Sequence, residues 1–306
     1  MKKRNTKSGL LLLAGGILML VFILTKEGWA QIPVSFSLNT KEVRMEKTAD
    51  PASIEHIKIN SGSTDVRVVP GSSDEIRTRL EGKASPAYAE KLRLDVKPQG
   101  ETLQIDVSAS DSFQIGINLT ELDLIVELPE KDWKSVSVRT QSGDAELAGL
   151  KGAKVEAEAG SGDIETKGIE AAQLKLRTSS GNIGTEEFKG EELAFRAESG
   201  DVSLTGVQSA LKGSAATGTI TVRTEELLYP ADLTTGSGDV IVQPARQPGN
   251  LSVDFRGGSG TGKIQWEGFT YRENNEEGDR IAGVFGAGEI PLKVHTSSGD
   301  FTLRRE

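Results

Sequence analysis

Oxygen-bearing side chains recur at nearly equal spacing in the second half of the chain, and they are the first candidates for chemistry. They are the third residue of the phrase Ser-Gly-Asp or a close variant, namely Asp144, Asp163, Asn182, Asp201, Thr219 and Asp239. Carboxylates in register could ligate calcium, because hard cations take six to eight oxygen ligands. Asn182 and Thr219 interrupt the column, however, and the glycine-rich nonapeptide of calcium-binding β-rolls is missing. We therefore assign no metal here and keep calcium as the alternative.

A glycine precedes each of these residues, which indicates a repeated turn. Glycine supplies a positive φ without steric cost, and the Asp or Asn that follows can hydrogen-bond its own backbone in an Asx-type turn. The predicted turn ladder consists of Gly143, Asp144, Gly162, Asp163, Gly181, Asn182, Gly200, Asp201, Gly218, Gly238, Asp239, Gly299 and Asp300. A residue that recurs in most turns is typical of architecture, whereas a catalytic residue occurs once.

Other reactive residue types are scarce. The absence of cysteine excludes disulfides, thiol catalysis, cysteine-ligated zinc and a lipidated cysteine. The two histidines, His56 and His295, lie far apart in strand-like segments, so we expect no shared ligand site. A polysaccharide lyase or hydrolase would need one localised cluster of acids or bases. We predict no enzyme activity, no catalytic residues and no cofactor, and a carbohydrate-active enzyme on a β-helix is the alternative.

The densest aromatic group is Trp266, Phe269 and Tyr271, in the segment IQWEGFTYREN. If they are exposed, these side chains could stack on a sugar or anchor a partner, because aromatic residues dominate interface energetics. If they are buried, they enlarge the core near the C-terminal end. We favour burial and keep the three as candidate partner-binding residues.

The elements that position the turn ladder repeat about every nineteen residues. Successive phrases start at intervals of 19, 19, 19, 18 and 20 residues, at Ser142, Ser161, Ser180, Ser199, Thr217 and Ser237. Such self-similarity is typical of units that bury their apolar faces by stacking on neighbours. Apolar residues alternate within each unit, which indicates strands. The pattern predicts an all-β protein, a β-solenoid resembling a parallel β-helix, with about nineteen residues and two short strands per rung.

Aligned units predict which side chains stack inside the rungs. One core column is Ala145, Ile164, Ile183, Val202, Ile220 and Val240, and another is Val155, Leu174 and Leu193. Lys175 and Arg177 alternate with the second column, so they are expected to face water. Upstream, Ser85 to Leu92 is the one segment where a short helical turn fits.

The amino terminus predicts the location. Residues 1–9 are basic and Leu10 to Leu24 are apolar or small, a run near the lower limit of the roughly 17–25 residues that span a bilayer. Lys26 and Glu27 separate this run from the small-x-small site Gly28-Trp29-Ala30. We predict an uncleaved signal anchor that is a transmembrane helix, with secretion after cleavage as the alternative. The basic N-terminus should stay in the cytoplasm, which leaves the body outside at the cell membrane.

The expected organisation is a cytoplasmic basic tail at 1–9, a signal anchor at 10–25, a juxtamembrane stalk at 26–53, an irregular β section at 54–135 and the regular solenoid at 136–306. The chain carries 36 Lys and Arg against 45 Asp and Glu, and five of those bases but only one acid lie in the first thirty residues. The acidic body excludes wrapping of nucleic acid, which requires many basic contacts to phosphate. Expected partners are the cytoplasmic membrane through residues 10–25, and a cell-wall glycan or another envelope protein.

Several motifs together resemble a known family. They are SGSTDVRVVPG at Ser61 to Gly71, LIVELP at Leu124 to Pro129, the serial SGD repeats, and TSSGDFTL at Thr296 to Leu303. Together with the N-terminal anchor they resemble the bacterial putative-adhesin family, a domain family of unknown function that includes LiaG, the membrane-anchored protein of the Lia cell-envelope stress system. The resemblance implies an extracytoplasmic β-repeat protein of a Gram-positive bacterium.

The same resemblance implies an adhesin-like binding or scaffolding surface, with a role in the envelope stress response. A regulatory partner of an envelope-stress sensor is a further alternative. The family offers no catalytic residues that could be transferred to this chain. Thr217-Gly218-Thr219, which replaces one SGD, and the stretched segment Gly258 to Trp266 depart from the pattern.

Overall fold

The computed structural model describes residues 40–109 and 120–305, and the chain from Asn39 onward forms one compact unit. The predicted basic tail and signal anchor, and the stalk up to residue 39, lie outside the described residues. Within the described part of the chain, no helix is long and apolar enough to cross a membrane.

Strands and tight turns make up almost all of this unit. The helix α2 (Pro86–Ala89) confirms the predicted helical turn within Ser85 to Leu92. The strands are β1 (Lys41–Ala49), β2 (His56–Ser61), β3 (Asp65–Pro70), β4 (Ile76–Ala84), β5 (Leu92–Gln99), β6 (Thr102–Ala109), β7 (Thr120–Leu128), β8 (Asp132–Thr140), β9 (Ala145–Ala148), β10 (Lys151–Ala159), β11 (Ile164–Lys167), β12 (Glu170–Ser180), β13 (Ile183–Glu186), β14 (Lys189–Ser199), β15 (Val202–Thr205), β16 (Gln208–Thr217), β17 (Ile220–Thr224), β18 (Ala231–Ser237), β19 (Val240–Pro244), β20 (Leu251–Gly257), β21 (Gly262–Ile264), β22 (Thr270–Asn274), β23 (Arg280–Val284), β24 (Ile290–Ser298) and β25 (Phe301–Leu303).

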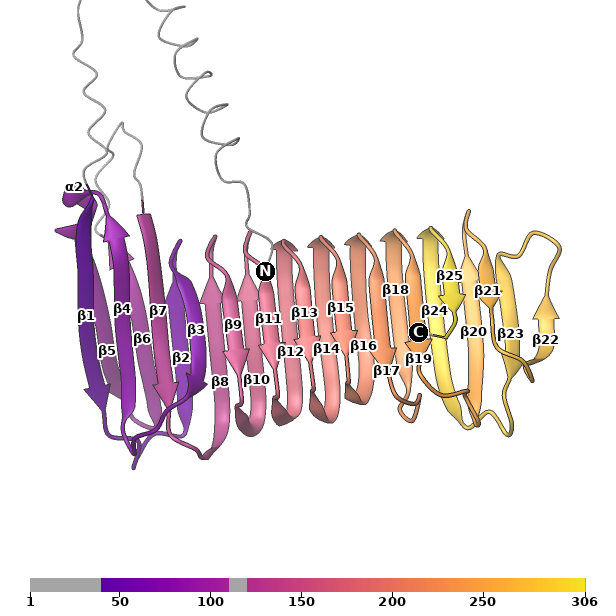
Figure 1. Ribbon diagram of the computed structural model, residues 1–306, viewed down its shortest axis with the longest axis horizontal. Helices are drawn as coiled ribbons and strands as arrows, with labels where there is room; N and C mark the ends of the chain where they lie inside the picture. The colour runs from indigo at the N-terminus through magenta and orange to yellow at the C-terminus, as the bar shows by residue number, and fades with distance from the viewer. Residues whose placement is uncertain (1–39, 110–119, 306) are drawn as a thin grey trace, which may run out of the picture. The chain divides into compact units, whose positions relative to one another are not determined.

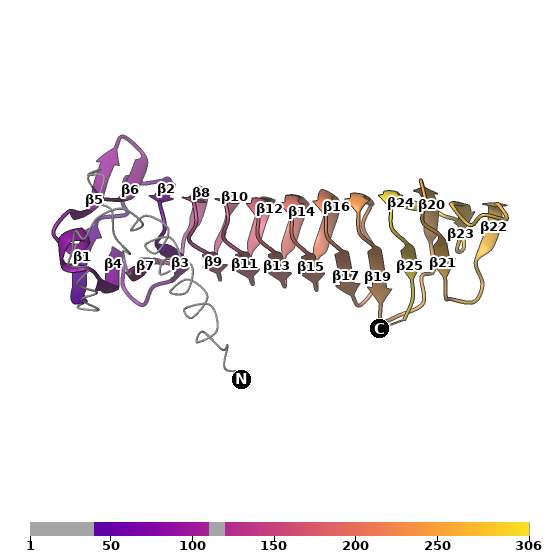
Figure 2. The ribbon, with the colours of Figure 1, turned by 90° about the horizontal axis from the view of Figure 1, so that it is seen from above.

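The strands form two sheets that lie face to face, as the view from above shows (Figure 2). The first sheet has twelve strands in the order β1-β4-β7-β3-β9-β11-β13-β15-β17-β19-β25-β21. The second sheet has thirteen strands in the order β22-β23-β20-β24-β18-β16-β14-β12-β10-β8-β2-β6-β5. Each regular rung gives one strand to each sheet, and the rungs stack side by side along the long axis (Figure 1).

The strand register confirms the nineteen-residue rung. In the first sheet Ile183 pairs with Ile164 on one side and with Val202 on the other. In the second sheet Leu174 pairs with Val155 and Leu193. Side chains of a strand alternate between its two faces, so both predicted columns are buried between the sheets while Lys175 and Arg177 are exposed. The largest buried side chains of this core are Trp133, Phe188, Phe255, Phe285 and Phe301.

The order of rungs at the C-terminal end differs from the order of the chain. The rung β24/β25 lies between β18/β19 and β20/β21, as its position in the sheets of Figure 1 shows. Leu292 of β24 therefore pairs with Ala231 of β18 and with Val253 of β20. The last rung of the sequence is thus an interior rung of the stack.

The N-terminal end shows the same inversion. The first rung, β2/β3, lies between β8/β9 and β6/β7. Val66 of β3 pairs in parallel with Ala145 of β9 and with Leu124 of β7. Both chain ends of the repeat region are therefore enclosed by other rungs.

Antiparallel strands close the stack, which a purely parallel solenoid would not contain. β1 pairs with β4 and β4 with β7 at one end, and β20, β23 and β22 pair in series at the other. Two of the four edge strands, β1 of the first sheet and β22 of the second, carry several charged residues. Charges on an edge strand oppose pairing with another chain, so these strands cap the repeats.

Candidate binding surface

The turn ladder is a line of hydrogen bonds between rungs. Oδ1 of Asp144 accepts the backbone N–H of Asp163 at 2.8 Å, and Oδ1 of Asp163 accepts that of Asn182 at 2.7 Å. The acceptor therefore bonds the equivalent residue of the next rung. This corrects the expected Asx-type turn, in which each side chain would bond its own backbone. The parallel rungs bring the next N–H closer, so the ladder holds the edges of the stack together.

The ladder has members that the spacing did not reveal. Oδ1 of Asp65 accepts the N–H of Asp144 at 2.9 Å, and Oδ1 of Asp300 accepts that of Thr261 at 2.8 Å. The phrase SGSTD, with two extra residues before Asp65, and the stretched segment around Thr261 were the available signals. Asp300 in turn donates its N–H to Asp239 Oδ1 at 2.8 Å, across 61 residues of sequence.

Glycine is required in the ladder because neighbouring backbones approach closely there, as well as because some of these residues have a positive φ. A Cβ at Gly162 or Gly181 would lie 2.1 Å from the carbonyl oxygen of the preceding ladder glycine. Four ladder glycines have a positive φ, namely Gly200, Gly218, Gly238 and Gly299. Gly143, Gly162 and Gly181 are not among the positive-φ glycines. The expectation that positive φ explains the whole column is therefore wrong for its first three members.

Three potential metal ligands meet away from the ladder. Within the described ranges, Glu55, His56 and Glu101 are the group whose ligand atoms all lie within 4.8 Å of one another. Lys134 forms an ion pair with Glu55, and this hydrogen bond lowers the pKa of the Glu55 carboxyl. One of the three potential ligands is therefore already paired with a cation. His56 bonds Ser135 Oγ at 2.7 Å, whereas His295 lies in β24 near the other end of the stack.

The three candidate aromatic residues differ in their exposure to solvent. Trp266 and Phe269 are half-buried against the core, and the Phe269 ring lies 4.9 Å from that of Phe285. Tyr271 is 47 % exposed, with its ring edge-on to Phe269 at 4.7 Å. Of these three residues, Tyr271 is the one that is exposed.

Two further apolar side chains are exposed in the turn between β17 and β18. Leu228 is 58 % exposed and Tyr229 is 41 % exposed. The sequence signal was the segment EELLYP at residues 225–230, which lengthens this interval to twenty residues. The same apolar residues would also suit a buried strand, so the sequence alone did not identify them as exposed.

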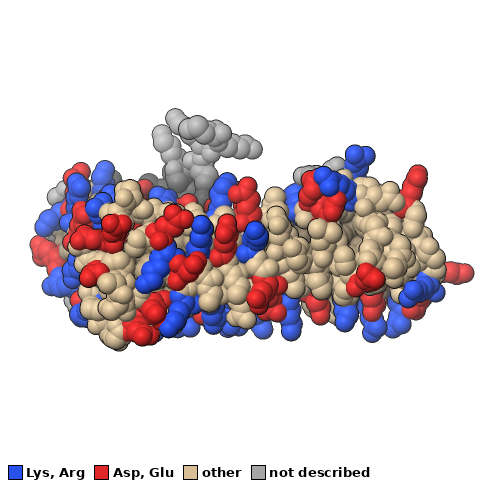
Figure 3. Space-filling view, turned by 90° about the horizontal axis from the view of Figure 1, so that it is seen from below, with Lys and Arg blue, Asp and Glu red and all other residues tan. Residues whose placement is uncertain are grey.

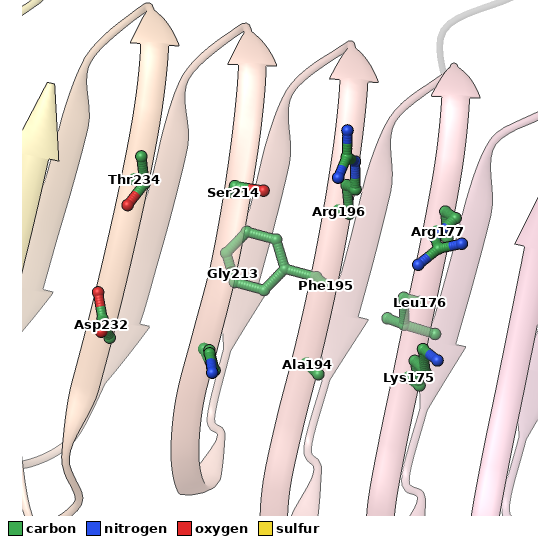
Figure 4. A pocket seen from close by; sticks show the side chains of 11 residues that line it. Lys175, Leu176, Arg177, Ala194, Phe195, Arg196, Gly213, Ser214, Asp232 and Thr234 are labelled. Carbon is green, nitrogen blue, oxygen red and sulfur yellow. The ribbon is translucent and has the colours of Figure 1, made fainter. Parts of the chain in front are cut away.

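The outer face of the second sheet carries a depression of about 400 Å³. Register places Ala194 between Lys175 and Lys212, so a small side chain lies between two long ones (Figure 4). Gly213 faces the core, where the Phe195 ring takes the place of its missing side chain and lies 2.2 Å from where a Cβ would be. Ser214 and Thr234 are the other small side chains of the lining. The long or charged ones are Lys175, Arg177, Arg196, Lys212 and Asp232. We call this site, lined by those residues, the basic depression.

Two cations of the basic depression have no acidic partner. Arg177 and Lys212 form no ion pair with any residue that the structure describes. Lys175 approaches Glu156 at 3.8 Å and Arg196 approaches Glu198 at 4.0 Å, both at the long end of the range for ion pairs. Asp232 is the acid among the lining residues. The site is therefore positive within an acidic protein.

Charge is distributed differently elsewhere on the molecule. Seen from below, acidic and basic side chains are interspersed over the N-terminal half, and the C-terminal half has a larger uncharged area (Figure 3). On the first sheet the basic side chains Arg67 and Lys167 pair with Glu146 and Glu186, each at 2.7 Å. Unpaired cations around a hollow thus distinguish the second sheet.

The family model of the Toastrack DUF4097 domain matches residues 54–304. The chain belongs to this family. The match covers both the irregular and the regular rungs, which agrees with the continuous core between the two sheets. The family assignment confirms the predicted resemblance to a domain family of unknown function, because the matched residues include the motifs that carry it.

Solved structures resemble the Toastrack chain at low sequence identity. A putative adhesin from Bacteroides fragilis is 12 % identical, with a TM-score of 0.50, and the match covers 86 % of this chain and 97 % of that one. A putative adhesin from Parabacteroides distasonis is 10 % identical over 85 % and 97 %, with a TM-score of 0.46. At this identity the first likeness shows a shared fold. No curated protein matches the chain.

Proposed function

We propose that this Toastrack protein is a membrane-anchored binding or scaffolding protein of the bacterial cell envelope, with an adhesin-like body outside the cytoplasm. The observation that carries the proposal is the outer face of the second sheet. Its exposed side chains are held in register on a buried core, and they surround the basic depression. A backbone held in register suits recognition, because little backbone entropy is lost on binding.

The location rests on the sequence of the N-terminus. The basic tail at 1–9 and the apolar run at 10–25 support an anchor whose downstream chain lies outside. The Bacteroides fragilis protein of similar fold is described as a putative adhesin, which supports a surface role. We extend the proposal to a LiaG-like role in the envelope stress response, on the basis of the motif resemblance.

The absence of cysteine from the chain allows a sharp test of the topology. A single cysteine is introduced into the body, Glu165→Cys, or into the basic tail, Asn5→Cys, and intact cells are treated with a membrane-impermeant maleimide. Glu165 is exposed, so the substitution leaves the core unchanged. We expect labelling of the body variant in intact cells and of the tail variant only after lysis. Equal protection of both variants in intact cells would contradict an external body.

The partner is tested in the native membrane. The full chain is crosslinked in cells, recovered from membranes and analysed for bound glycan and protein. A bound cell-wall glycan supports the binding or scaffolding role. Specific recovery of one membrane protein without glycan would favour the regulatory alternative.

A further inference from the structure

The basic depression lies across four neighbouring strands of one sheet. β12, β14, β16 and β18 carry two rows of outward side chains, and each step between strands is about 4.8 Å. The first row is Lys175, Ala194, Lys212 and Asp232, and the second row is Arg177, Arg196, Ser214 and Thr234. The residues that line the depression are spread over both rows and all four strands (Figure 4). Its shape suits an extended chain better than a compact small molecule.

The first row and the second row offer different kinds of contact. Arg177 and Arg196 are adjacent, and each guanidinium can hold a carboxylate or phosphate through two parallel N–H donors. The hydroxyls of Ser214 and Thr234 continue that row. Asp232 offers an acceptor for a ligand hydroxyl. A ligand that matches the rows carries both negative charges and hydroxyl groups.

The lining residues distinguish a sugar polymer from a nucleic acid. Single-stranded nucleic acids bind through exposed aromatic side chains on which the bases stack. The aromatic side chain of this site, Phe195, is 5 % exposed and lies under Gly213. The Asp232 carboxylate can accept hydrogen bonds from sugar hydroxyls.

We propose that the basic depression binds an acidic polysaccharide, with Arg177, Arg196 and Lys212 holding its negative groups. The polymer class rests on the proposed function at the envelope, whereas the charge and the shape of the site stand without it. Arg177 and Lys212 are free of ion pairs within the described chain, so binding need not break an internal contact.

The decisive experiment measures binding of polygalacturonate to the purified full chain by isothermal titration calorimetry. The test variant is the double charge reversal Arg177→Glu/Arg196→Glu. The control is Lys47→Glu/Lys83→Glu, which changes the net charge equally on exposed residues of β1 and β4 in the first sheet. We expect the test variant to lose at least about tenfold in affinity and the control less than about twofold. Equal losses in both variants would overturn the site.

A third variant tests shape at constant charge. Ala194→Trp fills the hollow between Lys175 and Lys212, and we expect it to weaken binding of polygalacturonate without changing the melting temperature by more than a few degrees. Unchanged affinity in this variant would show that the ligand does not enter the depression. The melting temperatures of all variants confirm that each has folded.

Three further probes define the ligand class. Neutral dextran should not bind, and inorganic phosphate should compete only weakly, because it lacks the length to contact both rows. A single-stranded oligonucleotide of equal charge should bind more weakly than polygalacturonate, and equal binding would overturn the assignment to polysaccharide.

The outcome separates this inference from the proposed location. The wild-type chain could bind polygalacturonate through Arg177 and Arg196 while Glu165→Cys is protected in intact cells. That result would support the site and refute the external body. Labelling of Glu165→Cys in intact cells with no binding of acidic polysaccharide would leave the location and refute the site.

Discussion

Asn182 and Asp201 occupy equivalent turns of neighbouring rungs, and Oδ1 of Asn182 accepts the backbone N–H of Asp201 at 2.9 Å. One rung earlier, the carboxylate of Asp163 makes the same bond to Asn182. The ladder bond therefore needs an oxygen acceptor of this length but no negative charge. This explains why asparagine interrupts the column without interrupting the ladder.

The ladder predicts a difference between two substitutions at Asp163. Asp163→Ala removes the acceptor for the Asn182 N–H and should lower the free energy of unfolding by about 1 kcal/mol. Asp163→Asn keeps an oxygen acceptor, as Asn182 does, and should stay within about 0.5 kcal/mol of wild type. Urea unfolding of both variants provides the measurement. Equal losses would mean that the charge matters and the hydrogen bond does not.

Glycine is required at Gly181 but not at Gly184. A Cβ at Gly181 would lie 2.1 Å from the carbonyl oxygen of Gly162, so Gly181→Ala should cost at least about 2 kcal/mol. At Gly184 the nearest atom is Glu165 Cγ at 3.7 Å, an ordinary contact. Gly184→Ala should leave stability unchanged or raise it by up to about 1 kcal/mol. Thermal unfolding of the pair checks the contrast.

The inward and outward faces of the rungs predict a second contrast. Ile183 is 1 % exposed between Ile164 and Val202, so Ile183→Asp should cost more than about 3 kcal/mol. Arg177 is exposed and unpaired, and Arg177→Glu should stay within about 0.5 kcal/mol. The two variants are compared by urea unfolding, and similar losses would refute the assignment of faces.

The first member of the ladder predicts a dependence on pH. Partial desolvation raises the pKa of the Asp65 carboxyl above its ordinary value of 3.8, opposed by the N–H of Asp144 and reinforced by the Asp144 and Asp123 carboxylates. A raised pKa in the folded state stabilises the fold below the ordinary pKa, and this contribution is lost as the pH rises through the folded value. Asp65→Asn removes the dependence while keeping an acceptor for Asp144.

Unfolding of wild type and Asp65→Asn is therefore compared at several pH values. The stability of the variant relative to wild type should increase as the pH rises from about 4 towards neutral. A difference that is constant over this range would show that Asp65 does not titrate differently in the folded protein.

Calcium provides a test of the turn ladder as a metal site. Each ladder aspartate already uses one oxygen for the next rung, as Asp144 and Asp163 show. We therefore expect a chelator to leave the melting temperature unchanged. If an ion were bound to the folded state, its removal would lower the melting temperature. A drop of roughly ten degrees would favour the calcium alternative.

The regular part of the fold could be predicted from the sequence because two independent patterns specify each rung. The nineteen-residue interval fixes which residues stack, and the alternation at Leu174, Lys175, Leu176 and Arg177 fixes which face water. A shift by one residue would exchange the two faces, so the pattern allows one register.

The order of the end rungs could not be predicted in the same way. The phrase at Asp300 fits equally well beside any ladder rung, and its neighbour Asp239 is 61 residues away. The basic depression could not be predicted from the sequence either. Lys175 and Arg177 were predicted to face water, but the hollow depends on the small side chain of Ala194 in the neighbouring rung. The positive charge of the site depends on the lack of ion pairs at Arg177 and Lys212 within the described residues.

The inverted order of the last rungs has a consequence for biosynthesis. β24 and β25 are synthesised after the other strands of the two sheets, yet β18 and β20 cannot be joined until β24 lies between them. Until then the repeats carry two open sheet edges, which are prone to pair with other chains. A nascent chain therefore cannot seal its C-terminal end before residues 290–303 have left the ribosome, and truncation within them removes an interior rung and leaves a gap.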